Sequence, residues 1–470
     1  MLSVKEKESR KQIRYVCIED LVPQNHLLRK VENAIDFGFV RAEVKDLYSV
    51  DKGRPSIDPV TLVKLCVINY MFGYNSMRRT IRECEVNVAY RWFIGYDLTE
   101  TIPHFTTFGK NYKRRFEGTD IFERVFIRVL AMAIENGLVD KSTVYIDGTH
   151  IKANANTHKN YKKLVENEAR SYDAQLRKEI NEDREEYGKK PFDDDDESGA
   201  PEQKEITVSK SDPESGLFHK GEHRKCFAYN AQVACDKHGW VLAATVNSGN
   251  KHDSTLFEEV YETVKENVGK PDAAVLDAGY LTPHIAKHLI DDCVDPYMPY
   301  KRPMTKKGFF PKYEYAYDEY YDCYVCPNNQ PLEYSTTNRD GYREYKSNQK
   351  ICVSCPHREQ CTLSTNHTKV VTRHIWQDYL ELVEDNRHTK KGKEVYERRK
   401  ETVERVFADG KEKHGLRFTR HNGLAKVKTQ VLLTFMVMNL KKLAKLTGGV
   451  PAFFQVVCGF FHFRRKKLAL

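Results

Sequence analysis

Three carboxylates in three different local settings are the residues of this sequence best suited to catalysis. Asp147 follows the β-branched and aromatic run 143–146, and Asp277 follows the apolar run 273–276. Both runs are typical of strands, so we expect each aspartate at the carboxyl end of a strand, where it is held rigidly. Glu404 lies in a long charged segment with helical spacing, from which it can approach the sheet from one side.

Oxygen-only ligands select hard cations such as magnesium or manganese. Two such ions can clamp the attacking and leaving oxygens of a phosphodiester. The sequence therefore predicts metal-dependent chemistry on nucleic acid, with Asp147, Asp277 and Glu404 as ligands of two Mg²⁺ (or Mn²⁺) ions.

The basic charge is concentrated around the glutamate. The 84 residues from Arg387 to the end hold 21 Lys or Arg and 6 Asp or Glu, whereas the rest of the chain is net acidic. A polyanion would have to bind there for the carboxylates to act on it. A solvated, lysine-rich helical surface is the alternative interpretation.

The 470 residues are enough for two to four domains. The charged amino terminus is not a secretory signal, and the apolar stretches 431–440 and 450–461 are too short to span a bilayer. We therefore expect a cytoplasmic protein with no membrane partner, in which the 12 cysteines are thiols or metal ligands rather than disulfides.

Residues 1–140 have the pattern of a helical domain. Asp58 and Pro59 mark a helix start, a second helix is expected over 76–86, and further helices are expected over 105–116 and 121–134. Clustered arginines and lysines on the shorter helices resemble a helix-turn-helix layout, which predicts an all-α DNA-binding domain.

The order of elements after residue 140 predicts an α/β catalytic core. A strand before Asp147, a hairpin over 227–246, a helix, a strand before Asp277, a helix and a short strand match a ribonuclease H-like fold. We assign 141–300 to the first part of this core, with a charged insertion at 160–225 that includes the acidic run 193–197. Residues 301–385 form a Cys-rich insertion, and 386–470 carry the glutamate helix and basic C-terminal helices.

The Cys-rich segment has the spacing of a structural zinc ribbon. Cys323 and Cys326 form one Cys-x2-Cys pair, Cys352 and Cys355 form another, and Cys361 follows after five more residues. Five thiolates are thus available for four tetrahedral positions, and zinc would replace a core that a Tyr-rich segment cannot build.

The register of the glutamate helix decides which basic residues accompany Glu404. On a continuous helix with about 100° per residue, Lys400, Glu404 and Lys411 lie at the edge of the buried stripe. There the lysines could hold phosphates beside the scissile bond, although Lys400 and Glu404 also have the spacing of an ordinary surface ion pair.

The chain resembles, over nearly its whole length, a bacterial insertion-sequence transposase of the DDE type with a Tyr, Arg, Glu, Lys signature. The segments that carry the resemblance are GRPSIDPVTLVKLCVINYMFGYNSMRRTI, YIDGTHIKANAN, FAYNAQVACD, NKHDSTLF, VLDAGYL, CVSCPHREQC and RHNGLAKVKTQVLLTFMVMNLKKL. The resemblance implies that Asp147, Asp277 and Glu404 are the catalytic metal ligands.

The resemblance also implies roles for the residues around them. Tyr396, Arg399 and Lys411 would be the signature partners that contact DNA, and Cys326, Cys352, Cys355 and Cys361 would bind zinc, with Cys323 as an alternative to Cys361. One departure concerns Arg399, because four residues separate it from Glu404 where the family has three. On a continuous helix Arg399 would point about 140° away, with Lys400 in its register.

The implied reaction is hydrolysis of a phosphodiester at the terminal inverted repeat of a mobile element, followed by attack of the freed 3′ hydroxyl on target DNA. The implied setting is a homodimer on DNA at the bacterial nucleoid. The alternatives are a catalytically inactive transposase-derived DNA-binding regulator and, less favoured, a nuclease that cuts without joining.

Overall fold

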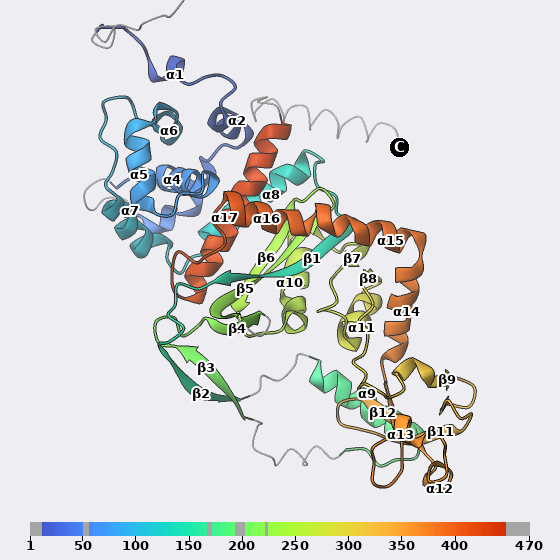
Figure 1. Cartoon of the computed structure of the whole chain (residues 1–470). Helices are drawn as coiled ribbons and strands as arrows, with labels where there is room; N and C mark the ends of the chain where they lie inside the picture. The colour runs from blue at the N-terminus through green and yellow to red at the C-terminus, as the bar shows by residue number, and fades with distance from the viewer. Residues whose placement is uncertain (1–11, 50–55, 167–171, 193–202, 221–223, 448–470) are drawn as a thin grey trace, which may run out of the picture.

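The structure is a computed structural model of the chain, and it describes residues 12–49, 56–166, 172–192, 203–220 and 224–447. It combines a helical N-terminal region, a large mixed sheet flanked by helices, and a smaller sheet at the far end of the molecule (Figure 1). The acidic run 193–197 and the C-terminal residues 448–470 lie outside the described residues.

The N-terminal region is helical, as predicted. Asp58 caps one helix by accepting a hydrogen bond from the Val60 amide (3.1 Å), and Ser76 caps the next through the Arg79 amide (3.3 Å). The helices are α1 (Ile18–Leu21), α2 (Leu27–Ala34), α3 (Phe39–Glu43), α4 (Pro59–Met71), α5 (Met77–Val86), α6 (Val88–Ile94), α7 (Phe105–Asn111) and α8 (Ile121–Glu135). A short π-helical segment, Tyr112–Phe116, continues α7.

A long C-terminal helix, α17 (Leu424–Leu446), joins the helical region to the large sheet. It packs against α8, α2 and α4 on one side and against strand β6 (Val241–Ser248) on the other. Many of its side chains are buried, from Val427 to Ala444. Figure 1 shows it lying between the two regions, so one continuous apolar core connects them.

The large sheet has eight strands. They are ordered β2 (Asn160–Glu166), β3 (Gln203–Ser209), β4 (Gly216–Lys220), β5 (Arg224–Asp236), β1 (Thr143–Lys152), β7 (Ala273–Val275) and β8 (Asp295–Tyr297), with β6 paired to β5. β5 is antiparallel to both β1 and β6, whereas β7 is parallel to β1 and β8 is parallel to β7. The central strand β1 therefore links the antiparallel and parallel halves.

β1 is longer than the sequence predicted. The strand continues past Asp147 to Lys152, because residues 144–152 pair with 228–236 of β5. The prediction that Asp147 ends a strand is therefore wrong. Asp147 lies in mid-strand, and its rigidity comes from continuous pairing with β5, in which Asp147 lies opposite Val233. Asp277 follows the end of β7 by two residues, close to the predicted position.

Helices cover both faces of this sheet. Helix α10 (Asp253–Val268) packs on β5 and β6, and α11 (Pro283–Asp291) packs beside β8. Helices α16 (Val403–Lys413) and α17 contact β1, β5 and β6. Since strand side chains alternate between faces, Gly148 faces the α10 side, and Asp147 and Thr149 face α16.

The described parts of the charged insertion form the antiparallel strand pair β2–β3, which extends from the sheet in Figure 1, the short strand β4, and helix α9 (Asp173–Glu186), which lies between β2 and β3 in the sequence. The charged insertion thus contains strands as well as a helix. Helix α9 docks on the second sheet, where Asp183 pairs with Arg343 at 2.5 Å.

The Cys-rich segment forms a separate five-stranded antiparallel sheet. Its order is β13 (Val370–His374), β12 (Tyr342–Ser347), β11 (Pro331–Thr337), β10 (Cys323–Val325) and β9 (Ala316–Asp318). Short helices α12 (Gln349–Cys352) and α13 (Arg358–Cys361) follow β12, and α14 (Gln377–His388) and α15 (Lys390–Glu397) lead back to the large sheet. Tyrosines dominate its small core.

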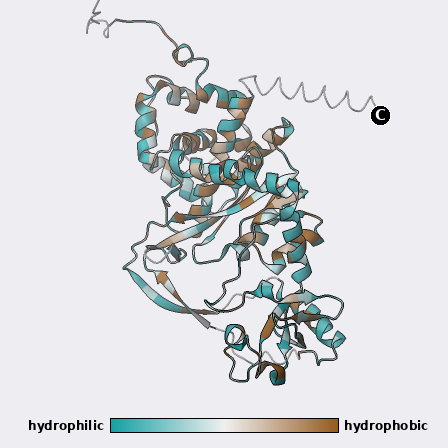
Figure 2. Ribbon diagram, turned by 45° about the vertical axis from the view of Figure 1, so that its right-hand side comes forward, coloured by the Kyte–Doolittle hydropathy of each residue, from teal (hydrophilic) through white to brown (hydrophobic). Residues whose placement is uncertain are grey.

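Polar and apolar residues alternate along most of the helices (Figure 2), as expected of helices that pack on a core with one face. Among helices within the described ranges, none combines the length and apolar character needed to cross a bilayer.

Candidate active site

Asp147 and Asp277 come together where β1 and β7 run side by side. Each carboxylate is oriented by the backbone: Oδ1 of Asp147 accepts a hydrogen bond from the Gly148 amide (2.8 Å), and Oδ1 of Asp277 accepts one from the Gly279 amide (2.6 Å). The parallel pairing of residues 143–145 with 273–275 sets their approach. Two aspartates 130 positions apart in the sequence are thus close enough for the charge of Asp277 to raise the pKa of Asp147.

The electrostatics of this site disfavour two ionised carboxylates. Burial raises the pKa of Asp147 to about 6, Arg399 opposes the rise, and the negative charges of Asp277 and Asp253 add to it. Ionised Asp147 therefore sits where additional positive charge would be favourable.

This pKa shift predicts a pH-dependent stability difference between the wild type and Asp147→Asn. The raised folded-state pKa means that the contribution of Asp147 is fully present below pH about 4 and is lost as pH rises through about 6. Asparagine does not titrate, so the wild type should lose up to about 3 kcal/mol relative to the variant over this interval. Urea unfolding at pH 4, 5, 6 and 7 with EDTA measures the difference, and parallel stability curves would contradict it.

Arg399 lies in the site, contrary to the geometry expected of a continuous helix. Its guanidinium is 2.6 Å from Oδ2 of Asp147, and only 8% of its side chain is exposed. The reason is a break in the helix: α15 ends at Glu397, a 3-10 segment spans Arg398–Glu401, and α16 begins at Val403. The uniform rotation of 100° per residue does not hold across this break.

Thr402 stabilises the break. It is buried, and its hydroxyl donates to the carbonyl of Arg398 (2.9 Å), which also accepts a hydrogen bond from the Thr402 amide (3.1 Å). The 3-10 segment directs Arg399 toward β1 and leaves Lys400 exposed. The prediction that Lys400 takes the register of the arginine is therefore wrong.

Glu404 lies on α16 between the two basic contacts to β1. Arg399 precedes it and reaches Asp147, and Lys411 follows it and donates to the Thr149 hydroxyl at 2.5 Å. Glu404 is exposed, and among the described residues its carboxylate takes part in no hydrogen bond or ion pair. Tyr396 is half-buried beside Arg399, whose guanidinium lies 3.4 Å from the Tyr396 hydroxyl.

The sequence did not single out Asp253, whose charge also acts on Asp147. Asp253 is the first residue of α10, and its Oδ1 accepts hydrogen bonds from the side-chain amides of Asn230 and Gln232, both at 2.8 Å. An acid at the start of a helix usually stabilises only that helix end, so the sequence around Asp253 did not predict a place for it near the site.

Three of the cysteines gather around Tyr315. The Tyr315 hydroxyl is 3.1 Å from Sγ of Cys361, and burial, followed by the charges of Cys361, Cys326 and Cys352, raises the pKa of Tyr315. The surroundings of Cys323 are different: burial and the acids Asp318, Asp322 and Glu333 raise the pKa of its thiol. The structure thus brings Cys326, Cys352 and Cys361 together, and Cys355 follows Cys352 by three residues.

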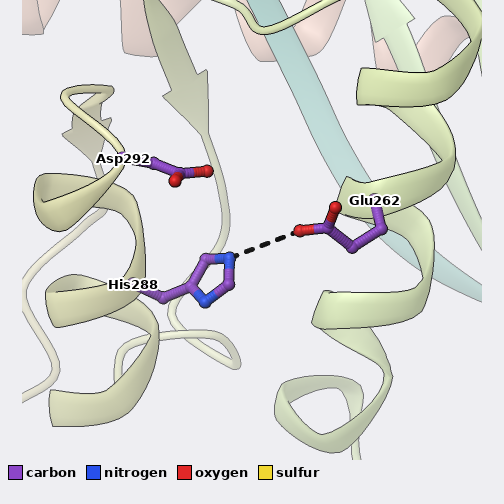
Figure 3. A group of neighbouring side chains, drawn as sticks. All are labelled: Glu262, His288 and Asp292. Carbon is purple, nitrogen blue, oxygen red and sulfur yellow. Dashed lines mark ion pairs between the residues drawn. The ribbon is translucent and has the colours of Figure 1, made fainter.

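In the described part of the chain, one group of three potential metal ligands has all its ligand atoms within 4.8 Å of one another: Glu262, His288 and Asp292 (Figure 3). The ammonium of Lys265 already lies 2.6 Å from Glu262 and 3.0 Å from Asp292. It supplies the positive charge that these acids need, so we interpret the group as an ion-pair network between α10 and α11.

Comparison with known proteins gives two family matches. Residues 16–114 match the transposase domain DUF772, which covers the N-terminal helices, and residues 325–444 match the transposase DDE domain, which includes Glu404. Asp147 and Asp277 lie outside both matched ranges. No curated protein and no solved structure matches the chain significantly. Together, the two family matches support an insertion-sequence transposase of the DDE type.

Proposed function

We propose that the chain is a metal-dependent DNA transposase that cuts the ends of a mobile element and joins each freed 3′ hydroxyl to target DNA. The observation that carries the proposal is the proximity of Asp147 and Asp277 to one stretch of chain that supplies Arg399 from the 3-10 segment and Glu404 and Lys411 from α16. Carboxylates beside basic side chains suit a reaction in which both metal ions and phosphates must be held.

A ribonuclease H-like core is part of this proposal. Its support is the strand order β6, β5, β1, β7, β8, in which the first three strands are antiparallel neighbours and the last two run parallel to β1. In such an arrangement, residues from β1 and from the end of β7 face one site. The helix that carries Glu404 contacts β1 and β5.

The donor set fits magnesium or manganese, because the ligands offered are carboxylate oxygens. The raised pKa of Asp147 supports this fit, because burial, with the nearby charges of Asp277 and Asp253, makes a bound cation favourable beside the ionised carboxylate. We assign Asp147, Asp277 and Glu404 as the ligands of two ions. A bound Mg²⁺ would activate the attacking oxygen and stabilise the leaving oxygen of the phosphodiester.

The basic residues would hold the DNA. Lys411 faces β1 from α16, and Tyr396 lies at the end of α15, directly before the helix break, so both could contact phosphates on either side of the carboxylates. Arg399 would neutralise the negative charge of Asp147 until a metal ion binds. Lys400, exposed at the helix break, is a candidate for contact with a more distant phosphate.

The N-terminal helices would bind the inverted repeats, and a homodimer would pair the two ends of the element.

The test uses purified protein, magnesium and linear DNA that carries the inverted repeats flanking its own coding region. We expect cleavage at the repeat ends and joined products in which the end is covalently linked to target DNA. DNA binding without any metal-dependent product would overturn the proposal. Cleavage without joining would show that the protein is a nuclease and not a transposase.

We also propose that Cys326, Cys352, Cys355 and Cys361 bind one structural zinc ion. Soft thiolates in two close pairs favour zinc, and the gathering of three of them around Tyr315 supports the set. Cys323→Ser should keep one zinc per chain, whereas Cys361→Ser should lose most of it and lower the melting temperature of the second sheet. Elemental analysis and thermal unfolding measure both effects. Equal zinc content in the two variants would refute this choice of ligands.

A further inference from the structure

Asp253, at the start of α10, lies close to two glycines that neighbour the aspartates of the site. A Cβ atom on Gly148 would stand 2.6 Å from Oδ1 of Asp253 and 2.5 Å from Nε2 of Gln232. A Cβ atom on Gly279 would stand 2.9 Å from Oδ1 of Asp277 and 3.7 Å from Oδ2 of Asp253. The carboxylates of Asp253 and Asp277 therefore border the same small space, the one kept open by Gly279.

The two oxygens of Asp253 have different surroundings. Oδ1 is held by the amides of Asn230 and Gln232, and Gln232 in turn accepts a hydrogen bond from the buried Tyr280 hydroxyl. Oδ2 accepts no hydrogen bond from the described residues, and it is not among the buried polar atoms that lack a partner. Oδ2 is thus open to solvent on the side of Asp277, while the side chain is fixed through Oδ1.

We propose that Asp253 is a fourth carboxylate of the catalytic centre and supplies Oδ2 as a ligand to the cation held by Asp277. This inference rests on the proposed metal-dependent function. Magnesium and manganese take about six oxygen ligands, and ligating carboxylates are characteristically fixed by hydrogen bonds from a surrounding shell of side chains. The amides of Asn230 and Gln232 form that shell here, Gly148 lets Oδ1 of Asp253 approach β1 closely, and the absence of a side chain at Gly279 keeps the space beside Oδ2 free.

The experiment measures Mn²⁺ binding to the full chain by electron paramagnetic resonance, with no DNA present. Asp253→Asn keeps the size of the side chain and an acceptor for the amides, but removes the negative charge. We expect its Mn²⁺ affinity to fall at least about 10-fold. Glu266→Gln, an exposed residue of the same helix about 20 Å along its axis, is the matched control and should bind Mn²⁺ as the wild type does.

Gly279→Ala provides an independent variant, since its Cβ would enter the space between Asp253 and Asp277 while both charges remain. We expect weaker Mn²⁺ binding here too, with a melting temperature close to that of the wild type. A merely structural role of Asp253 would lower the melting temperature of Asp253→Asn and leave Mn²⁺ affinity unchanged, which would overturn the inference.

Asp277→Asn separates this inference from the proposed function. Loss of Mn²⁺ binding in Asp277→Asn with wild-type affinity in Asp253→Asn would refute the role of Asp253 alone. A wild-type chain that binds no Mn²⁺ would refute both.

Discussion

Asp147→Asn should reduce magnesium-dependent cleavage of an element end by about 1,000-fold or more. The substitution removes the charge of a proposed metal ligand, and a metal ion contributes several kcal/mol to stabilising the transition state. The side chain is fixed by the Gly148 amide and by its place in mid-strand, so a neighbouring carboxylate cannot readily replace it. Single-turnover cleavage of labelled DNA measures the loss, and DNA binding in EDTA should persist.

The matched control is Asp295→Asn. Asp295 lies on the same sheet, at the opposite end of the parallel strands from Asp277, and forms an exposed ion pair with Lys391 at 3.0 Å. Exposed pairs contribute about 0–1 kcal/mol, so this variant should cut at nearly the wild-type rate. Wild-type cleavage by Asp147→Asn, or an equal loss in Asp295→Asn, would remove Asp147 from the active site.

Glu404→Gln should have an effect of the same size, about 1,000-fold, whereas Glu401→Gln should cut nearly as the wild type does. Both glutamates are exposed and lie close together, but the helix break separates their roles. Glu404 belongs to α16 and is seven residues before Lys411, which places both on one face of that helix with an offset of about 20°. Glu401 ends the 3-10 segment on the other side of Thr402.

The same single-turnover assay decides between the two glutamates. A large loss in Glu401→Gln with wild-type activity in Glu404→Gln would show that the break, and not α16, presents the third carboxylate. Equal losses in both variants would indicate that the substitutions disturb the break itself. Thermal unfolding of each variant then identifies that cause, because a disturbed break would lower the melting temperature.

The sequence predicted those elements whose signals are local. The cap at Asp58, the proline after it and the apolar spacing located α4 within a residue, and Ser76 located α5 in the same way. The runs before Asp147 and Asp277 located β1 and β7 because β-branched residues mark strands. The length of β1 was missed, because β5 rather than the composition of residues 148–152 extends it.

The position of Arg399 could not be read from helical periodicity. Periodicity assumes an unbroken helix, and the break depends on the buried Thr402 hydroxyl and on packing against the sheet. Asp253 was missed for a related reason. Its amide partners come from β5, and its relation to Gly148 and Gly279 exists only after three separate segments of the chain have assembled.

The sequence by itself determined the types of chemistry available: the acids Asp147, Asp277 and Glu404, the basic C-terminal segment and the paired cysteines. Residue identity and local hydrogen bonding are properties of short segments, so they can be read directly. Only the tertiary structure decided that Arg399 pairs with Asp147 and that the charge of Asp253 acts on Asp147. Electrostatic interactions of this kind depend on distances of a few ångströms between residues that are more than 100 positions apart, and only the folded chain sets those distances.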